Sequence, residues 1–220
     1  MPRKLFAKTK RNPITLKGGG SMKLPDPALD GDVSIEKAIH QRRTIRSFES
    51  TTMSLKHLSQ VLWAAQGITD PKGFMRAAPS AGALYPMDIY IAAGRESVEK
   101  LESGVYHYMS GTHSLSLVTH GDVRTDIAMA SLGQMWMART PLTLVITAEY
   151  KRIMGKYGRR GVRYAMIEAG HIGQNIFLQS QALGLAAGIV GAFEDREVIR
   201  VTGIPDTHEP LLIMPVGSKK

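Results

Sequence analysis

Apolar residues recur at the spacing of an α-helix in five segments of the chain. The clearest is 55–66, where positions 55, 58, 61, 62 and 65 are apolar and Gly67 follows as a stop. Ser34 is a suitable N-cap for a helix over 35–43, because its hydroxyl can accept a hydrogen bond from the first turn. The same spacing predicts further helices at 122–137, 162–183 and 195–201.

Short apolar runs between these segments predict strands. Residues 105–109 and 114–118 form a predicted hairpin with its turn at 110–113. Other strands are predicted at 88–93, 142–148, 185–190 and 211–216. Helices and strands do not alternate one for one, so their order favours an α+β sandwich over a doubly wound sheet.

The composition excludes several kinds of chemistry. The chain has 220 residues, of which 43% are hydrophobic and 21% charged, so it can bury a substantial core. It contains no cysteine, which removes disulfides, a thiolate nucleophile, iron–sulfur clusters and cysteine-ligated zinc. No apolar run reaches the roughly 18 residues of a membrane span, and the N-terminus lacks a secretory signal, so a cytoplasmic protein without membrane contact is expected.

The positive charge is concentrated at the N-terminus. The net charge is +9, but residues 1–22 hold six of the 28 basic residues and none of the 19 acidic ones. We therefore predict a flexible basic arm over 1–22, which ends in a glycine run, and one folded domain over 23–220. An arm of this kind could hold a nucleic acid or another anionic surface without enzymatic activity, and this alternative stays open.

Arginines gather where the first predicted helix ends. Within Arg42-Arg43-Thr44-Ile45-Arg46, three guanidinium groups and a hydroxyl offer charge-assisted hydrogen bonds to an anion such as a phosphate. Basic residues at a helix C-terminus also stabilise the helix dipole, so the cluster by itself leaves a purely structural role open.

Two further segments are rich in small residues. Pro79-Ser80-Ala81-Gly82 and Gly188-Ile189-Val190-Gly191 would let the backbone approach a flat ligand closely, although either could be a plain turn. No Walker A sequence occurs, and no G-x-G-x-x-G stands between a strand and a helix, which disfavours P-loop and Rossmann sites. Lys219, near the end of the chain, could reach a phosphate or serve only as a solubilising charge.

Together these segments resemble the nitroreductase-like superfamily of FMN-dependent oxidoreductases, most closely its SagB-type dehydrogenase branch, over residues 24–219. The resemblance rests on four motifs in the family's order: R-R-T-I-R-S-F at 42–48, P-S-A-G-x-x-Y-P at 79–86, R-Y-A-x-I-E-A-G-H-x-x-Q-N at 163–175 and A-L-G-L-A-x-G-I-V-G-A-F at 182–193. It implies an α+β three-layer sandwich in which helices flank a central mixed sheet. It also implies an intertwined homodimer with FMN bound at the subunit interface.

The resemblance assigns roles to the cofactor-binding residues. It implies that Arg42, Arg43, Thr44, Arg46 and Lys219 hold the phosphate and ribityl end of FMN, with one guanidinium near N1 and O2. Pro79, Ser80, Ala81 and Gly82 would lie along the ring from the partner subunit. Gly188, Ile189, Val190 and Gly191 would cover one ring face and offer a backbone amide toward N5. A fixed cation near N1 stabilises reduced flavin, which makes this arrangement chemically reasonable.

The implied reaction is ping-pong hydride transfer. NADH or NADPH, as a transient donor, would reduce FMN and leave, and a small organic acceptor such as a nitro compound or quinone would take its place. Some SagB-type members instead dehydrogenate azoline rings in peptides, a reaction associated with a Lys-Tyr pair, for which Lys156 and Tyr157 are the matching candidates as a proton shuttle.

A metal-based oxidoreductase is the remaining alternative. Glu168-x-x-His171 has the spacing found in di-iron carboxylate bundles, but those sites need a second copy of the motif and further carboxylates. The sequence lacks a second copy, so no metal site is expected.

Overall fold

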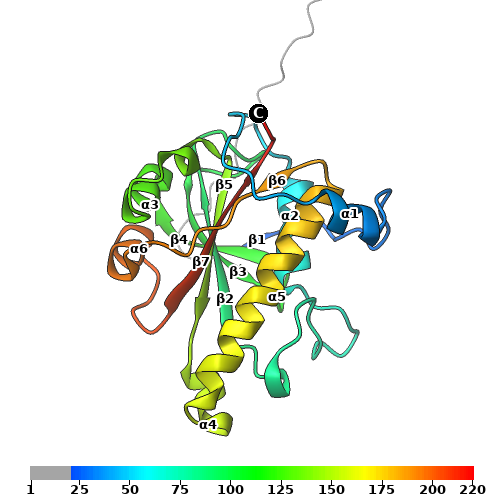
Figure 1. Cartoon of the computed structure of the whole chain (residues 1–220), viewed down its shortest axis with the longest axis vertical. Helices are drawn as coiled ribbons and strands as arrows, with labels where there is room; N and C mark the ends of the chain where they lie inside the picture. Colours follow the sequence, from blue (N-terminus) through cyan, green and yellow to red (C-terminus); the bar gives the residue numbers. More distant parts are fainter. Residues whose placement is uncertain (1–20) are drawn as a thin grey trace, which may run out of the picture.

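The computed structural model describes residues 21–220, which form one seven-stranded sheet covered by helices (Figure 1). The strand order across the sheet is β1–β4–β3–β2–β5–β7–β6. The strands are β1 (Ser21–Lys23), β2 (Met87–Ala93), β3 (Gly104–Met109), β4 (Ser114–His120), β5 (Leu142–Ala148), β6 (Ala186–Ala187) and β7 (Glu209–Gly217). The helices are α1 (Ile35–Gln41), α2 (Leu55–Gln66), α3 (Arg124–Ala130), α4 (Lys151–Tyr157), α5 (Arg160–Ala182) and α6 (Asp195–Thr202), with 3-10 helices η1 (Ala81–Ala83) and η2 (Met135–Arg139).

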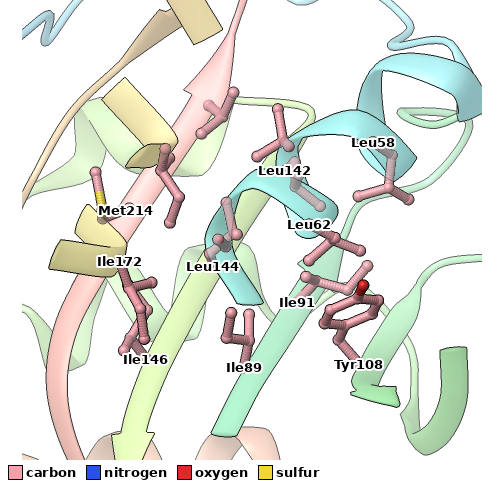
Figure 2. Packing of buried hydrophobic residues seen from close by; sticks show 14 of the residues in the cluster. Leu58, Leu62, Ile89, Ile91, Tyr108, Leu142, Leu144, Ile146, Ile172 and Met214 are labelled. Carbon is pink, nitrogen blue, oxygen red and sulfur yellow. The ribbon is translucent and has the colours of Figure 1, made fainter. Parts of the chain in front are cut away.

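The core lies on both faces of the sheet, as expected for a three-layer α+β sandwich. Along β2, Ile89 and Ile91 belong to the cluster that packs under α2 and α5, whereas Tyr90 belongs to the cluster under α3 and α6. Figure 2 shows Leu58 and Leu62 of α2 gathered with Ile89 and Ile91 in the first cluster. Each fully buried leucine of this kind contributes about 1.5–3 kcal/mol.

The predicted mixed sheet is wrong in strand direction, because every pairing between the seven strands is antiparallel. β5 and β6 do run in the same direction, as strands joined through the crossover helix α5 should. β7 lies between them and pairs antiparallel with both, so the parallel pair does not form. Parallel contacts occur in the described chain only as isolated bridges, Thr44 to Ala187 and Met53 to Val98.

The predicted helix over 55–66 and the predicted strand over 142–148 are confirmed to the residue. The predicted helix over 122–137 is wrong. It is broken into α3 and η2, since Leu132 and Gly133 both adopt positive φ, at 55° and 73°. The predicted strand over 185–190 is reduced to β6 and a single bridge from Val190 to Ile213.

The first described strand begins before the predicted domain boundary at residue 23. Ser21 and Met22 belong to β1, which pairs with β4, and the Met22 side chain is buried. The rest of the predicted basic arm, 1–20, lies outside the described residues. Within 21–220, none of the helices combines the length and hydropathy that spanning a bilayer requires.

Candidate active site

Three of the predicted phosphate ligands meet in one cavity. Arg42 and Arg43, at the end of α1, and Lys219, near the C-terminus, line a cavity of about 240 Å³ at the C-terminal end of α5. The small residues Ala186 and Ala187 of β6 form part of its wall. α1, β6 and the C-terminus lie close together at this end of α5 in Figure 1.

Backbone contacts hold these distant segments together. Thr44 bridges to Ala187, and the amide of Ile45 donates to the carbonyl of Ala187 at 3.0 Å. On the other side, Phe48 bridges to Lys219, and the amide of Lys220 donates to the carbonyl of Ser47 at 3.3 Å. The segment that follows α1 is therefore fixed between β6 and the end of the chain, which sets where Arg42 and Arg43 stand.

The predicted arginines differ in their surroundings. Arg43 Nη1 donates to the carbonyls of His40 and Arg42, at 2.8 and 2.7 Å, which orients its guanidinium group. The Arg42 guanidinium lies 5.3 Å from the centre of the Phe177 ring, a cation–π distance. Thr44 is half-buried and Arg46 is exposed, and neither lines the cavity within this single chain.

In the segment Gly188–Gly191, every second backbone amide donates a hydrogen bond to β7. The amide of Gly188 donates to the Pro215 carbonyl, and that of Val190 to the Ile213 carbonyl. Those of Ile189 and Gly191 have no hydrogen-bond partner among the described residues. The sequence did not distinguish these four amides, whereas the strand geometry leaves two as donors for a ligand.

Lys156 and Tyr157 lie against the turn that contains Pro79–Gly82. A Cβ atom built on Gly82 would stand 2.7 Å from Tyr157 Oη and 3.0 Å from Lys156 Nζ. The Lys156 ammonium lies 5.3 Å from the centre of the Tyr157 ring, and this ring packs edge-on against that of Tyr164. Two segments predicted separately, one for the cofactor and one for proton transfer, are thus neighbours.

Beneath this turn lies a polar network that sequence reasoning missed. Glu168 of α5 is 1% exposed, and its Oε1 accepts from Gln66 Nε2 at 3.0 Å. Arg76 Nη1 donates to Gln66 Oε1 at 2.9 Å. Burial raises the pKa of Glu168 to about 7, and Ser80, Gln66 and Arg76 only partly offset it. The motif drew attention to Glu168, but its partners lie far from it in sequence.

The two residues of the Glu168-x-x-His171 motif stand in different surroundings. Glu168 is buried and accepts a hydrogen bond from Gln66 of α2, whereas His171, three residues further along α5, is exposed. A separate group, formed by Asp88, Glu149 and His208, has ligand atoms within 4.8 Å of one another. Arg152 already pairs with both carboxylates at 2.6 Å, so a guanidinium cation occupies the place between them.

The arginine cavity and the Gly82 turn stand at different ends of α5. Glu168, beside the turn, and Gln181, in the cavity wall, are 13 residues apart, or about 20 Å along a helix. Along α5 one face is exposed at helical spacing, at positions 163, 166, 167, 170, 171 and 174. We call these six positions the open face of α5. Its apolar members Met166 and Ile167 are 53% and 49% exposed.

Comparison with known proteins identifies the family to which this chain belongs. The sequence profile of the nitroreductase family matches residues 39–218. The chain belongs to the nitroreductase family. Its members are oxidoreductases that generally use FMN and are typically dimeric. The resemblance inferred from the four motifs is therefore confirmed.

Individual family members cover most of the chain. The nitroreductase-family protein MJ1384 of Methanocaldococcus jannaschii is 39% identical over 91% of this chain and 98% of its own. The microcin B17-processing protein McbC of Escherichia coli is 27% identical over 77% of this chain and 64% of McbC. The crystal structure of a family member from Ralstonia eutropha superposes with a TM-score of 0.80 and 26% identity, over 95% of this chain and 94% of that one.

Proposed function

We propose that this chain is an FMN-dependent oxidoreductase that works as a homodimer and moves a hydride between a nicotinamide and a small organic acceptor, such as a nitro compound or a quinone. The observation that carries the proposal is that Arg42, Arg43 and Lys219 line one cavity. The chain belongs to a family that generally uses FMN, whose phosphate is a suitable partner for these cations. Three cations at one point suit a phosphate monoester, which carries close to two negative charges at neutral pH.

The size of the cavity supports a site shared between two chains. At about 240 Å³ it is smaller than the roughly 300–1,000 Å³ typical of small-molecule sites, so one chain encloses only the phosphate end of the cofactor. Bound FMN would supply the hydride-transfer chemistry, which the side chains of the protein lack. Arg42, Arg43 and Lys219 would hold its phosphate, and the free amides of Ile189 and Gly191 would orient its ring.

A two-fold dimer would complete the site. If the open face of α5 packs against its own copy across a two-fold axis perpendicular to the helix, the two helices run antiparallel. The arginine cavity of one subunit then comes close to the turn at Gly82 of the other. This arrangement covers Met166 and Ile167, and it brings Pro79–Gly82 to the flavin from the partner subunit, as the resemblance implies.

A second candidate function is dehydrogenation of azoline rings in a peptide. The observation that favours it is the contact of Lys156 Nζ and Tyr157 Oη with the Gly82 turn, where a substrate at the ring edge would lie. The similarity to McbC, a protein that processes microcin B17, supports this candidate. Tyr157 would accept the proton released from the ring carbon, and the adjacent ammonium of Lys156 would stabilise the phenolate.

The visible spectrum of the purified protein tests the cofactor, and anaerobic bleaching by NADH or NADPH tests the donor. Arg42→Ala should weaken FMN binding by about 1.5–3 kcal/mol, through the loss of a charge-assisted contact. Arg196→Ala, which removes an exposed charge from α6, is the matched control and should leave FMN affinity unchanged. Equal affinity in wild type and Arg42→Ala would show that the phosphate binds elsewhere.

The two candidate reactions are separated by their electron donors. An azoline-containing peptide should bleach the flavin anaerobically without nicotinamide only if the second candidate is correct. Tyr157→Phe should then abolish oxidation of the peptide and retain nitro or quinone reduction. Tyr164→Phe serves as the control, because it removes a hydroxyl from the neighbouring ring that packs on Tyr157 and keeps the ring itself. A full reaction with Tyr157→Phe would remove Tyr157 from the mechanism.

The basic arm has its own test. Deletion of residues 1–20, which spares Ser21 and the buried Met22 of β1, should leave a yellow, active protein if the function is enzymatic. Salt-sensitive binding to nucleic acid that disappears with the arm, in a colourless protein without activity, would favour the binding alternative instead.

A further inference from the structure

Glu168 is an ionisable group buried in the middle of α5, and no cation among residues 21–220 forms an ion pair with it. Its carboxyl is 1% exposed, and the nearest guanidinium, that of Arg76, is reached only through the side chain of Gln66. An unneutralised buried carboxyl costs stability, and an apolar residue or a glutamine would fill the same space without that cost. Its presence therefore calls for an explanation beyond packing.

The hydrogen bonds around Glu168 have a fixed direction. Arg76 can only donate, so Gln66 accepts with Oε1 and must donate with Nε2 to Glu168 Oε1. Ser80 Oγ accepts from the amide of Tyr85 at 2.9 Å, which leaves its own hydrogen free to turn toward the Glu168 carboxyl, whose buried Oε2 has no hydrogen-bond partner among residues 21–220. Both neighbours thus present donors, and a carboxylate, which only accepts, satisfies them best.

The same network holds the turn over 79–85. The Arg76 amide donates to Tyr85 Oη at 3.2 Å, and its guanidinium lies 4.3 Å from the centre of the Tyr85 ring. Gly82, Ala83 and Tyr85 all adopt positive φ, at 63°, 52° and 48°. Two of these three residues carry a Cβ atom, so the conformation is strained and depends on the contacts beneath it.

The outer side of this turn touches the proposed proton shuttle. Gly82 lies against Tyr157 Oη and Lys156 Nζ, and the Tyr157 ring packs on Tyr164, which stands one helical turn before Glu168 on α5. If the contacts between Glu168 and the turn weaken, the turn can shift, and the positions of the Lys156 and Tyr157 side chains then change with it.

We propose that Glu168 is a positioning residue whose ionised form draws Ser80 and Arg76 inward, holds the 79–85 turn against Lys156 and Tyr157, and thereby sets the pH range of activity. This inference rests on the proposed function, because it concerns the turn that would contact the flavin and the substrate. Protonated Glu168 attracts Arg76 less and no longer accepts from both donors, so the strained turn loosens.

The direction of the pH dependence follows from the surrounding groups. Arg76, from the loop after α2, and Gln66 and Ser80 favour the carboxylate, while burial opposes it and raises the pKa of Glu168 to about 7. Tyr85 and Tyr108 face Arg76, and Asp88 and Arg152 act on it with opposite signs from β2 and α4. Activity should therefore rise with pH through about 7, in the range where Glu168 loses its proton.

The first experiment compares the pH profiles of kcat for wild type and Glu168→Gln with the same donor and acceptor. Wild type should show a limb near pH 7, and Glu168→Gln should lose that limb and stay low, because its amide places a donor against Ser80 or Gln66. The double variant Gln66→Glu with Glu168→Gln returns a carboxylate to the chain, now directly beside Arg76, and should restore activity with the limb moved to lower pH. An unchanged limb in Glu168→Gln would overturn the proposal.

A second measurement needs neither turnover nor a variant. In isotope-labelled wild-type protein, the NMR signals of the Glu168 carboxyl carbon and of the Gly82 amide should titrate with one shared midpoint. A Gly82 signal that ignores the titration of Glu168 would overturn the coupling even if Glu168→Gln did not fold.

Failure of this inference is distinguishable from failure of the proposed function. A colourless wild-type protein that no nicotinamide reduces would contradict the proposed function. A yellow, active protein whose pH limb survives in Glu168→Gln would contradict only the role of Glu168.

Discussion

Gly82 leaves little room for a side chain in the candidate site. Its φ of 63° suits glycine, and an added Cβ would stand 2.7 Å from Tyr157 Oη, well inside contact distance. We expect Gly82→Ala to displace the phenol and lower kcat at least about tenfold, a loss near 1.4 kcal/mol in transition-state stabilisation. Because the phosphate contacts lie elsewhere, FMN titration should show a smaller loss of affinity than Arg42→Ala gives. Gly111→Ala, at a turn with open space around it, is the control.

Glu168 also makes a prediction about stability. Its pKa is about 7 in the folded protein, against 4.5 for a solvent-exposed glutamate, so the folded state binds more protons than the unfolded state between these values. Its contribution to the free energy of unfolding should therefore fall as pH rises from about 4.5 to 7, by about 3 kcal/mol, and stay lowered above 7. Urea unfolding from pH 5 to 8 measures this, and a slope unchanged by Glu168→Gln would contradict it.

Single residues show where sequence reasoning succeeds. The R-R-T-I-R motif drew attention to Arg42 and Arg43, and both line one cavity together with Lys219, while their role in phosphate binding stays a prediction. The Gln66–Glu168 contact could not be predicted, because its partners are 102 residues apart and glutamine carries no motif. The difference between the amides of Ile189 and Val190 was equally hidden, since it depends on how the segment pairs with β7.

At the scale of elements, the position of Arg42 in the candidate site depends on the stability of α1, which ends directly before it. Ser34 caps it by accepting from the Lys37 amide at 3.2 Å, and α1 has only seven residues before Arg42. Ser34→Ala should cost about 1 kcal/mol and weaken FMN binding, because fraying of so short a helix reaches Arg42. Ser54→Ala removes the equivalent cap of α2 and should cost a similar free energy without changing FMN affinity. Equal FMN affinities in both variants would contradict this link.

Elements with a clear period and a clear stop were predicted best. α2 has five apolar positions on one face and ends at Gly67, and its predicted bounds are correct. The segment 122–137 has helical spacing as well, but Leu132 and Gly133 adopt positive φ and break the helix. The spacing of apolar residues does not reveal which residues adopt a left-handed backbone conformation. Strand direction was missed because it depends on where β7 inserts, which apolar runs do not encode.

For the whole molecule, the proposed dimer makes the open face of α5 the surface through which two subunits would complete each other's sites. Ile167 is 49% exposed in the single chain and would be buried at the proposed two-fold interface. Ile167→Glu places a charge there, and burying an unpaired carboxylate costs several kcal/mol, so we expect a monomer by light scattering. Since the partner's turn is then missing, FMN retention should fall with dimerisation, even though Arg42, Arg43 and Lys219 are unaltered.

Met129→Glu is the matched control for this variant. Met129 lies on α3, on the other layer of the sandwich, and is 61% exposed, so the substitution adds the same charge at a comparably open apolar position. It should leave both the dimer and the bound flavin intact. A monomeric Ile167→Glu protein that keeps FMN with wild-type affinity would show that one chain suffices for the site, because the cavity between α1, β6 and the C-terminus would then bind the cofactor without the second subunit.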